Sequence, residues 1–109
     1  MESCIFCQIA GGASTPFVYA DEEVVAFRDI QPQAPVHLLV VPRRHIASLN
    51  DARDEALLGR LLAVARDAAA SVGLNQYRVV VNTGADAGQS VLHVHLHVLG
   101  GRIMAWPPG

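Results

Sequence analysis

Three of the five histidines stand at every second position in the stretch HVHLHVL, residues 93–99. In a β-strand, successive side chains point to opposite faces, so His93, His95 and His97 would line one face at a spacing of about 6.6 Å. Imidazoles that close could share one small anion or one metal ion. The alternative is a strand that merely tolerates histidines on a solvent-exposed face, and the strict alternation argues against it.

A segment of small residues, GADAGQS at positions 84–90, lies just before the histidines. Glycines and small side chains allow consecutive backbone N–H groups to point at an anion. The segment lacks the Gly-Lys-Ser/Thr ending and the following helix of a Walker loop. By itself, an ordinary hairpin connection explains it better. Joined directly to a face of histidines, it predicts a phosphate site beside a row of nucleophiles.

The chemistry of imidazole suits such a site. A neutral imidazole is a good nucleophile toward phosphorus, and its ordinary pKa near 6.5 leaves it largely neutral at pH 7. Three imidazoles on one face also resist simultaneous protonation, because each added positive charge disfavours the next. One ring can therefore attack while another, protonated, donates. Backbone N–H groups would stabilise the negative charge of the transition state, and this chemistry requires no metal.

Cys4 and Cys7 form a C-x-x-C pair near the amino terminus. In a reducing compartment this spacing more often indicates metal binding or redox chemistry than a structural disulfide. A thioredoxin-like arrangement would require an apolar strand before Cys4, and the sequence has none. Two buried cysteines on a short helix are the remaining alternative.

The pattern of apolar residues predicts a single α+β domain over residues 1–109. We expect five short strands, mainly antiparallel because most of their connections are too short for crossovers, with one short and one long helix. The predicted strands are residues 18–20, 24–28, 36–41, 77–81 and 91–99, and the predicted helices are residues 3–9 and 51–72. Gly73 is the expected cap at the end of the long helix.

Composition excludes several classes of protein. The formal net charge is −2 and the only basic pair is Arg43-Arg44, whereas a nucleic-acid surface needs clustered Lys and Arg. The longest strongly apolar run, Val36–Val41, is far shorter than the roughly 20 residues of a membrane-spanning helix. The amino terminus shows no secretory signal. We therefore expect a cytoplasmic protein that binds neither nucleic acid nor membrane.

Several segments together resemble one known family, the histidine triad (HIT) superfamily. Besides the alternating histidines, the matching segments are residues 4–9, 26–37, 41–46, 88–91, 99–102 and 106–109. The last of them, Trp106-Pro107-Pro108-Gly109, is similar to the Hint branch, whose members are purine nucleoside phosphoramidases. It is less similar to the Fhit-like dinucleoside polyphosphate hydrolases.

The resemblance implies a HIT-like fold and a homodimer in which two five-stranded sheets join into a ten-stranded sheet. It also implies hydrolysis of the P–N bond of a nucleoside 5′-phosphoramidate, with His95 as the nucleophile and a nucleotidyl-histidine intermediate. His37, His97 and Ser90 would complete the catalytic group. Asp29 would accept hydrogen bonds from both ribose hydroxyls. The other residues implied to contact substrate are Ile5, Phe6, Ile9, Phe27, Ile30, Leu39, Asn82, Gly88, Gln89 and Val91.

The C-x-x-C pair departs from the Hint proteins of animals and is similar to bacterial members of the superfamily that bind zinc. That resemblance implies four ligands, Cys4, Cys7, His45 and His93. A Cys2His2 set is typical of a closed tetrahedral structural site, so the zinc would support the fold and catalysis would not need it. The alternative is a metal-free site in which the cysteines are ordinary thiols and His93 only orients its neighbour.

Two other functions remain open from the sequence. One is a dinucleoside polyphosphate hydrolase, and the other is a nucleotide-binding regulatory module whose catalysis is vestigial. The homodimer also draws support from the alanine-rich apolar stripe over residues 57–72, which suits close packing. The alternative for that stripe is a helix that simply covers its own sheet.

Overall fold

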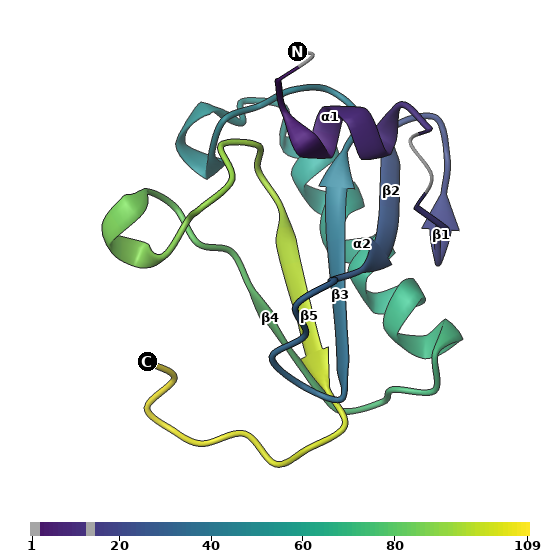
Figure 1. Ribbon diagram of the computed structural model, residues 1–109, viewed down its shortest axis with the longest axis vertical. Coiled ribbons are helices and arrows are strands. Elements are labelled where there is room, and N and C mark those ends of the chain that lie inside the picture. Colours follow the sequence, from purple (N-terminus) through teal and green to yellow (C-terminus); the bar gives the residue numbers. More distant parts are fainter. Residues whose placement is uncertain (1–2, 13–14) are drawn as a thin grey trace.

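The structure is a computed structural model that describes residues 3–12 and 15–109. Five strands form one sheet in the order β1-β2-β3-β5-β4, and all neighbouring strands are antiparallel (Figure 1). The strands are β1 (Tyr19–Ala20), β2 (Val24–Arg28), β3 (Val36–Pro42), β4 (Tyr77–Val80) and β5 (Leu96–Gly100), and the α-helices are α1 (Ile5–Ala10) and α2 (Glu55–Ser71). The predicted α+β architecture is confirmed.

The long helix α2 begins four residues later than the sequence pattern predicts. Leu49–Asp51 form a separate 3-10 turn, and Asp54 is the N-cap of α2. The Asp54 carboxylate accepts a hydrogen bond from the N–H of Leu57 at 3.1 Å, which satisfies a donor that the first turn would otherwise leave free. The helix ends as predicted before Gly73, whose φ of +84° lies in the left-handed region that glycine tolerates.

Each face of the sheet has its own apolar cluster. The helix α2 packs behind the sheet (Figure 1) and buries six residues, Leu57, Leu61, Val64, Ala65, Ala68 and Ala69. On the other face, Phe6 and Ala10 of α1 are buried with side chains of β2 and β3. The predicted apolar stripe of α2 therefore covers its own sheet, and it is not by itself an argument for a dimer.

The histidine strand is shorter than predicted, because β5 begins at Leu96 and the prediction began at residue 91. Pairing with β3 ends at Val40 opposite Leu96. Before that point, the N–H of Val94 donates instead to the carbonyl of Ile46 at 2.6 Å. Only His97 therefore lies within the strand. The main-chain carbonyls of residues 91–95 therefore do not accept hydrogen bonds from β3, and side chains can donate to them.

Within residues 3–12 and 15–109, the strand β4 pairs only with β5, so its other edge is open. Beyond β5, the chain leaves the sheet as a segment without helix or strand (Figure 1). Two of its large side chains are exposed, Ile103 at 95% and Trp106 at 80%. Arg78 of β4 holds this segment by donating to the carbonyl of Ala105 at 2.9 Å. Among helices in the described part of the chain, none is both long and apolar enough to cross a membrane.

Gly101, just after β5, is a point where the backbone requires glycine. Its φ is +90°, and a Cβ added there would lie 2.9 Å from Cβ of Pro35. We expect Gly101→Ala to lower the free energy of unfolding by about 1–3 kcal/mol, because it adds backbone strain and a steric clash. Gly59→Ala is the control, since this position in α2 has open space and the change should stabilise the helix by up to about 1 kcal/mol. Equal changes in the free energy of unfolding for the two variants, measured by urea unfolding, would contradict this account.

Candidate active site and metal centre

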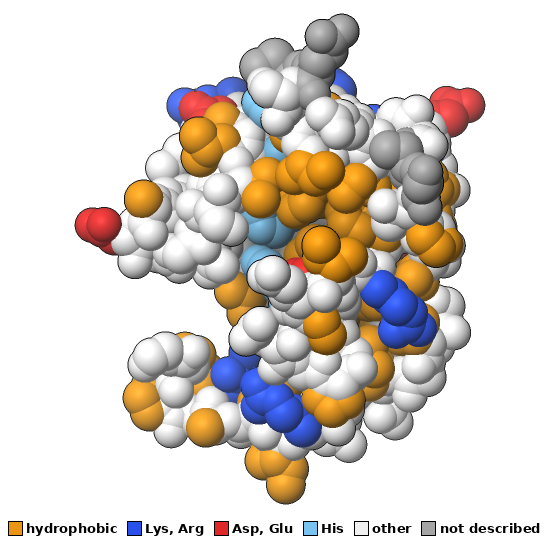
Figure 2. All heavy atoms as spheres, in the orientation of Figure 1, with side chains coloured by type: hydrophobic (Ala, Val, Ile, Leu, Met, Phe, Trp, Pro, Cys, Tyr) orange, Lys and Arg blue, Asp and Glu red, His pale blue; other side chains and the backbone are white. Residues whose placement is uncertain are grey.

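The histidines gather in a hollow on the face of the sheet that carries α1. Figure 2 shows their side chains at the bottom of the hollow, with hydrophobic side chains beside them. The ring centroids of His95 and His97 are 5.0 Å apart, and those of His37 and His97 are 5.1 Å apart. His37 comes from β3, opposite Leu99 of β5. The structure thus brings together the three histidines to which the sequence analysis assigned catalysis.

His95 is oriented by a main-chain contact at its Nδ1. Its Nδ1 lies 2.7 Å from the carbonyl oxygen of His93. A carbonyl can only accept, so Nδ1 carries the proton and Nε2 carries the lone pair. The ring is 5% exposed, and its burial lowers the pKa of His95. The Phe6 ring meets it edge-on at 4.9 Å. A neutral ring with its lone pair on Nε2 is the protonation state that a nucleophilic imidazole needs.

His37 and His97 contact each other on the same face of the sheet. The N–H of Gln33 donates to Nδ1 of His37 at 3.0 Å, and Nε2 of His37 lies 2.8 Å from Nδ1 of His97. A carboxylate oxygen of Asp29 lies 3.5 Å from the same Nε2. Burial lowers the pKa of His37, and burial together with His95 and His37 lowers the pKa of His97 to about 4. Both rings are therefore neutral at pH 7.

The low pKa of His97 makes the stability of the protein depend on pH. In the unfolded chain this pKa is near 6.5, so between about pH 6.5 and pH 4 the unfolded state binds more protons than the folded state. The free energy of unfolding should therefore decrease as the pH falls through this window. We expect His97 to account for about 2 kcal/mol of that loss.

Urea unfolding of the wild type and of His97→Gln, at about pH 7 and pH 4.5, measures this contribution. The wild type should lose more stability than the variant on acidification. An equal loss in the two proteins would show that His97 takes up its proton as readily in the folded state as in the unfolded chain.

The loop over residues 84–90 is closed mainly by its own hydrogen bonds. Gln89 is 6% exposed, and its amide accepts from the N–H of Gly84 and donates to the carbonyls of Ala47 and Val91. The N–H groups of residues 87–89 also donate within the loop. The expected row of free N–H groups is therefore reduced. Over residues 3–12 and 15–109, no hydrogen bond engages the N–H groups of Ser90 and Val91 or the hydroxyl of Ser90.

The apolar residues assigned to the base pocket fall into two groups. Phe6, Phe27 and Leu39 are buried in the cluster beneath α1, and Ile9 packs against that cluster, so all four also serve the core. The exposed members are Ile5 at 48% and Ile30 at 93%. The neighbouring Asp29 is partly buried.

Asp29 and Ile30 also line a cavity of about 530 Å³ with residues 15–18 and Arg28. This volume would hold a group the size of a nucleobase. The amide of Asn82 lies beside Gly88, at the end of the loop that carries Ser90. The structure therefore places the Asp29 carboxylate beside His37 and the Phe6 ring beside His95, with the Asn82 amide at the loop that leads to the histidines.

Four possible metal ligands meet at the amino-terminal end of α1. The ligand atoms of Cys4, Cys7, His45 and His93 all lie within 4.8 Å of one another. Nδ1 of His93 is 3.3 Å from Sγ of Cys4 and 3.5 Å from Sγ of Cys7, while Nδ1 of His45 is 3.3 Å from the latter. Nε2 of His93 donates to the carbonyl of Pro42 at 2.8 Å, which leaves the lone pair of Nδ1 facing the thiols.

This donor set fits zinc. Two thiols and two imidazoles in one tight group are typical of a closed tetrahedral site, with no position left for substrate. Asp29, His37 and His97 form a second group of possible ligands within the same distance. There, however, Nε2 of His37 and Nδ1 of His97 are already hydrogen-bonded to each other at 2.8 Å. The second group is therefore better described as a hydrogen-bonded chain.

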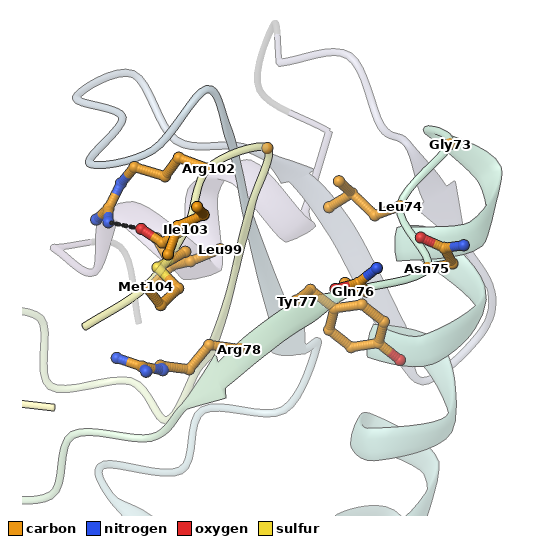
Figure 3. A pocket seen from close by; sticks show the side chains of 11 residues that line it. Gly73, Leu74, Asn75, Gln76, Tyr77, Arg78, Leu99, Arg102, Ile103 and Met104 are labelled. Carbon is orange, nitrogen blue, oxygen red and sulfur yellow. Dashed lines mark hydrogen bonds between the residues drawn. The ribbon is translucent and has the colours of Figure 1, made fainter. Parts of the chain in front are cut away.

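A separate cavity of about 580 Å³ lies where the carboxyl-terminal segment leaves the sheet (Figure 3). Its two arginines, Arg78 and Arg102, both donate to main-chain carbonyls of that segment. Its lining contains no histidine, cysteine or carboxylate. It therefore offers none of the groups required for the chemistry of the histidine site.

Sequence reasoning missed three main-chain groups that orient the histidines. They are the N–H of Gln33, which contacts His37, the carbonyl of Pro42, which contacts His93, and the carbonyl of His93, which contacts His95. Every residue except proline carries an N–H and every residue carries a carbonyl, so no residue type signals these contacts. Only the folded backbone shows them.

The chain is similar to known proteins over most of its length. The HIT domain family matches residues 11–104. A HIT family hydrolase from Legionella pneumophila Philadelphia 1 has a solved structure that is 48% identical, with a TM-score of 0.92 over 98% of this chain and 100% of that one.

Two further solved structures each have a TM-score of 0.79. A zinc-bound histidine triad family protein from Mycobacterium smegmatis is 34% identical over 93% of this chain and 76% of that one. A histidine triad nucleotide-binding protein from Candida albicans is 31% identical over 96% and 83%. The family match extends over most of the chain and includes the histidine cluster, and the chain therefore belongs to the HIT domain family.

Proposed function

We propose that this protein hydrolyses the P–N bond of purine nucleoside 5′-phosphoramidates, releasing a nucleoside monophosphate and an amine. The observation that carries the proposal is the state of His95, a neutral buried ring whose Nδ1 donates to the His93 carbonyl and whose Nε2 keeps its lone pair. A nucleophile in this state can attack phosphorus at neutral pH without a metal. The naming of similar solved proteins as HIT family hydrolases agrees with this reaction class.

The reaction then runs in two displacements. Nε2 of His95 attacks phosphorus, the P–N bond to the amine breaks, and the amine nitrogen takes up a proton from solvent as it leaves. Water next attacks the phosphorus of the nucleotidyl-histidine and gives up a proton to solvent, the bond to Nε2 breaks, and the nucleoside monophosphate is released. The N–H groups of Ser90 and Val91 and the hydroxyl of Ser90, which no hydrogen bond engages within the described residues, would bind the phosphoryl oxygens in both steps.

The nucleoside half of the substrate would lie over the apolar side of the hollow. Asp29, whose carboxylate also reaches His37, would accept from the ribose hydroxyls. Ile5 and Ile30 offer the exposed apolar surface for a base, and Asn82 lies beside the loop that would carry the phosphate. The similar protein from Candida albicans is named as nucleotide-binding, which supports a nucleotide as the ligand.

We also propose that Cys4, Cys7, His45 and His93 hold a structural zinc ion. The support is their Cys2His2 chemistry and close grouping, together with the zinc-bound relative. The ion would anchor the short helix α1, and with it Phe6, which contacts His95. The homodimer belongs to the same proposal: the open edge of β4 is free to pair with a second copy.

A side-by-side rate comparison tests the proposed reaction. The purified protein is given an adenosine 5′-phosphoramidate and, separately, a diadenosine polyphosphate at equal concentration. We expect a higher kcat/KM for the P–N bond. Faster cleavage of the P–O–P anhydride would assign the protein to polyphosphate hydrolysis instead. Tight binding of AMP without turnover of either compound would identify a binding module.

A further inference from the structure

We propose that the main-chain N–H of Gln33 is a positioning group that acts through His37 to make Nε2 of His97 a hydrogen-bond donor toward the reacting phosphoryl group. The inference rests on the proposed function for the identity of the group that receives this hydrogen bond. The chain of contacts that carries it is internal to the protein and exists without substrate.

The first step fixes the proton on His37. A backbone N–H can only donate, so Nδ1 of His37, 3.0 Å from the N–H of Gln33, must present its lone pair. A neutral imidazole carries one proton, and that proton must then be on Nε2. The carboxylate of Asp29, 3.5 Å from Nε2, attracts a proton at the same position. His37 is 5% exposed, so water has little access to reverse this choice.

The second step passes the constraint to His97. Nε2–H of His37 donates to Nδ1 of His97 at 2.8 Å, so Nδ1 is an acceptor and the proton of His97 is on Nε2. That nitrogen is buried and has no hydrogen-bond partner anywhere in residues 3–12 and 15–109. A buried unpaired N–H costs about 1–3 kcal/mol. Because the group lies in a candidate active site, we infer that this N–H donates to a bound ligand.

The neighbouring ring is held in the opposite way. A main-chain carbonyl, that of His93, orients His95, and therefore its Nε2 has a lone pair and no proton. A main-chain N–H orients His97 through His37, and therefore its Nε2 has a proton. The two rings lie 5.0 Å apart. One can attack phosphorus while the other donates to a phosphoryl oxygen, and two backbone groups of opposite polarity determine which does which.

The neutral state of both rings supports this assignment. Burial lowers the pKa of His37, and the pKa of His97 is about 4. At pH 7 each ring therefore holds a single proton, and the position of that proton follows from the hydrogen bonds. The assignment needs no charged histidine.

The direct test is the ¹⁵N NMR spectrum of the imidazole rings in the substrate-free wild type at pH 7. We expect His37 and His97 to carry the proton on Nε2 and His95 to carry it on Nδ1. A proton on Nδ1 of His97 would overturn the inference without any variant.

Two changes at Gln33 then test the source of the constraint. Gln33→Pro removes the N–H, whereas Gln33→Ala removes the side chain and keeps the N–H. We expect Gln33→Ala to retain the wild-type spectrum. Gln33→Pro should shift His37 and His97 mostly to the form with the proton on Nδ1, and kcat should fall by about 10- to 100-fold, because the donor is lost from most of the population. An unchanged spectrum in Gln33→Pro would overturn the inference.

Proline could also distort the loop. Introducing the same substitution into a His37→Gln variant separates that distortion from the loss of the N–H. In His37→Gln, the side-chain NH2 group can donate to Nδ1 of His97 and has no tautomers to choose between. Adding Gln33→Pro to this variant should change kcat by less than about twofold. The same loss in both backgrounds would assign the effect to loop geometry and overturn the inference. If the wild type hydrolyses no phosphoramidate, the proposed function fails, whereas the NMR spectra still decide the proton positions.

Discussion

Replacing His95 with alanine should lower kcat for an adenosine 5′-phosphoramidate by about four orders of magnitude or more, with the affinity for AMP nearly unchanged. Removal of a nucleophile that forms a covalent intermediate has effects of this size. AMP binding should persist because Asp29, Ser90 and Val91 remain. Steady-state kinetics and calorimetric titration with AMP measure the two quantities.

Two matched variants separate chemistry from packing. His95→Asn keeps a side-chain N–H that can donate to the His93 carbonyl, yet offers no nucleophilic nitrogen, so it should be as inactive as the alanine variant. Leu92→Ala alters an exposed side chain of the same segment and should leave kcat unchanged. Activity of His95→Asn near that of the wild type would show that the ring only fills space.

Removal of the proposed zinc site should have the second large effect. In Cys4→Ser combined with Cys7→Ser, bound zinc should fall from about one ion per chain to almost none, and the free energy of unfolding should drop by more than about 3 kcal/mol. A helix as short as α1, with six residues, is not stable by itself in water. Without the metal, the position of α1 would depend on the packing of Phe6 and Ala10 and on the hydrogen bond from Arg43 to the Ala10 carbonyl.

Reversibility provides the control for this experiment. Wild-type protein treated with a chelator should lose the same stability and regain it when zinc is added, whereas the double variant should not respond. Zinc affinity should weaken as the pH falls, because protons compete for the thiolates and burial raises the pKa of Cys7. Well under one zinc per chain in protein prepared without chelators, or full zinc occupancy in the double variant, would contradict the site.

The spacing of the histidines was sufficient to predict that they share one face, because side-chain alternation is a property of any extended chain. It could not show that β5 begins only at Leu96. That boundary depends on Val94 donating to the distant Ile46 carbonyl, a contact that has no local signal. The start of α2 was more accessible, since Asp54 just before an apolar helical pattern is a recognisable N-cap.

The tautomers of the histidines were outside the reach of sequence reasoning. They depend on the N–H of Gln33 and the carbonyls of Pro42 and His93, main-chain groups that carry no residue-type signal. The C-x-x-C spacing indicated Cys4 and Cys7 as possible metal ligands, whereas His45 and His93 were assigned only through a family resemblance. The structure places Cys7 beside His45, 38 positions away in the chain.

The most direct test of the account is to trap the intermediate. The wild-type protein is mixed with an adenosine 5′-phosphoramidate, quenched at neutral to alkaline pH during turnover, digested, and examined by mass spectrometry. The account predicts a nucleotidyl group on the peptide that contains His95, attached to that residue, and absent when His95→Ala is treated identically. Turnover without any modified peptide, or modification at His97 in place of His95, would contradict it.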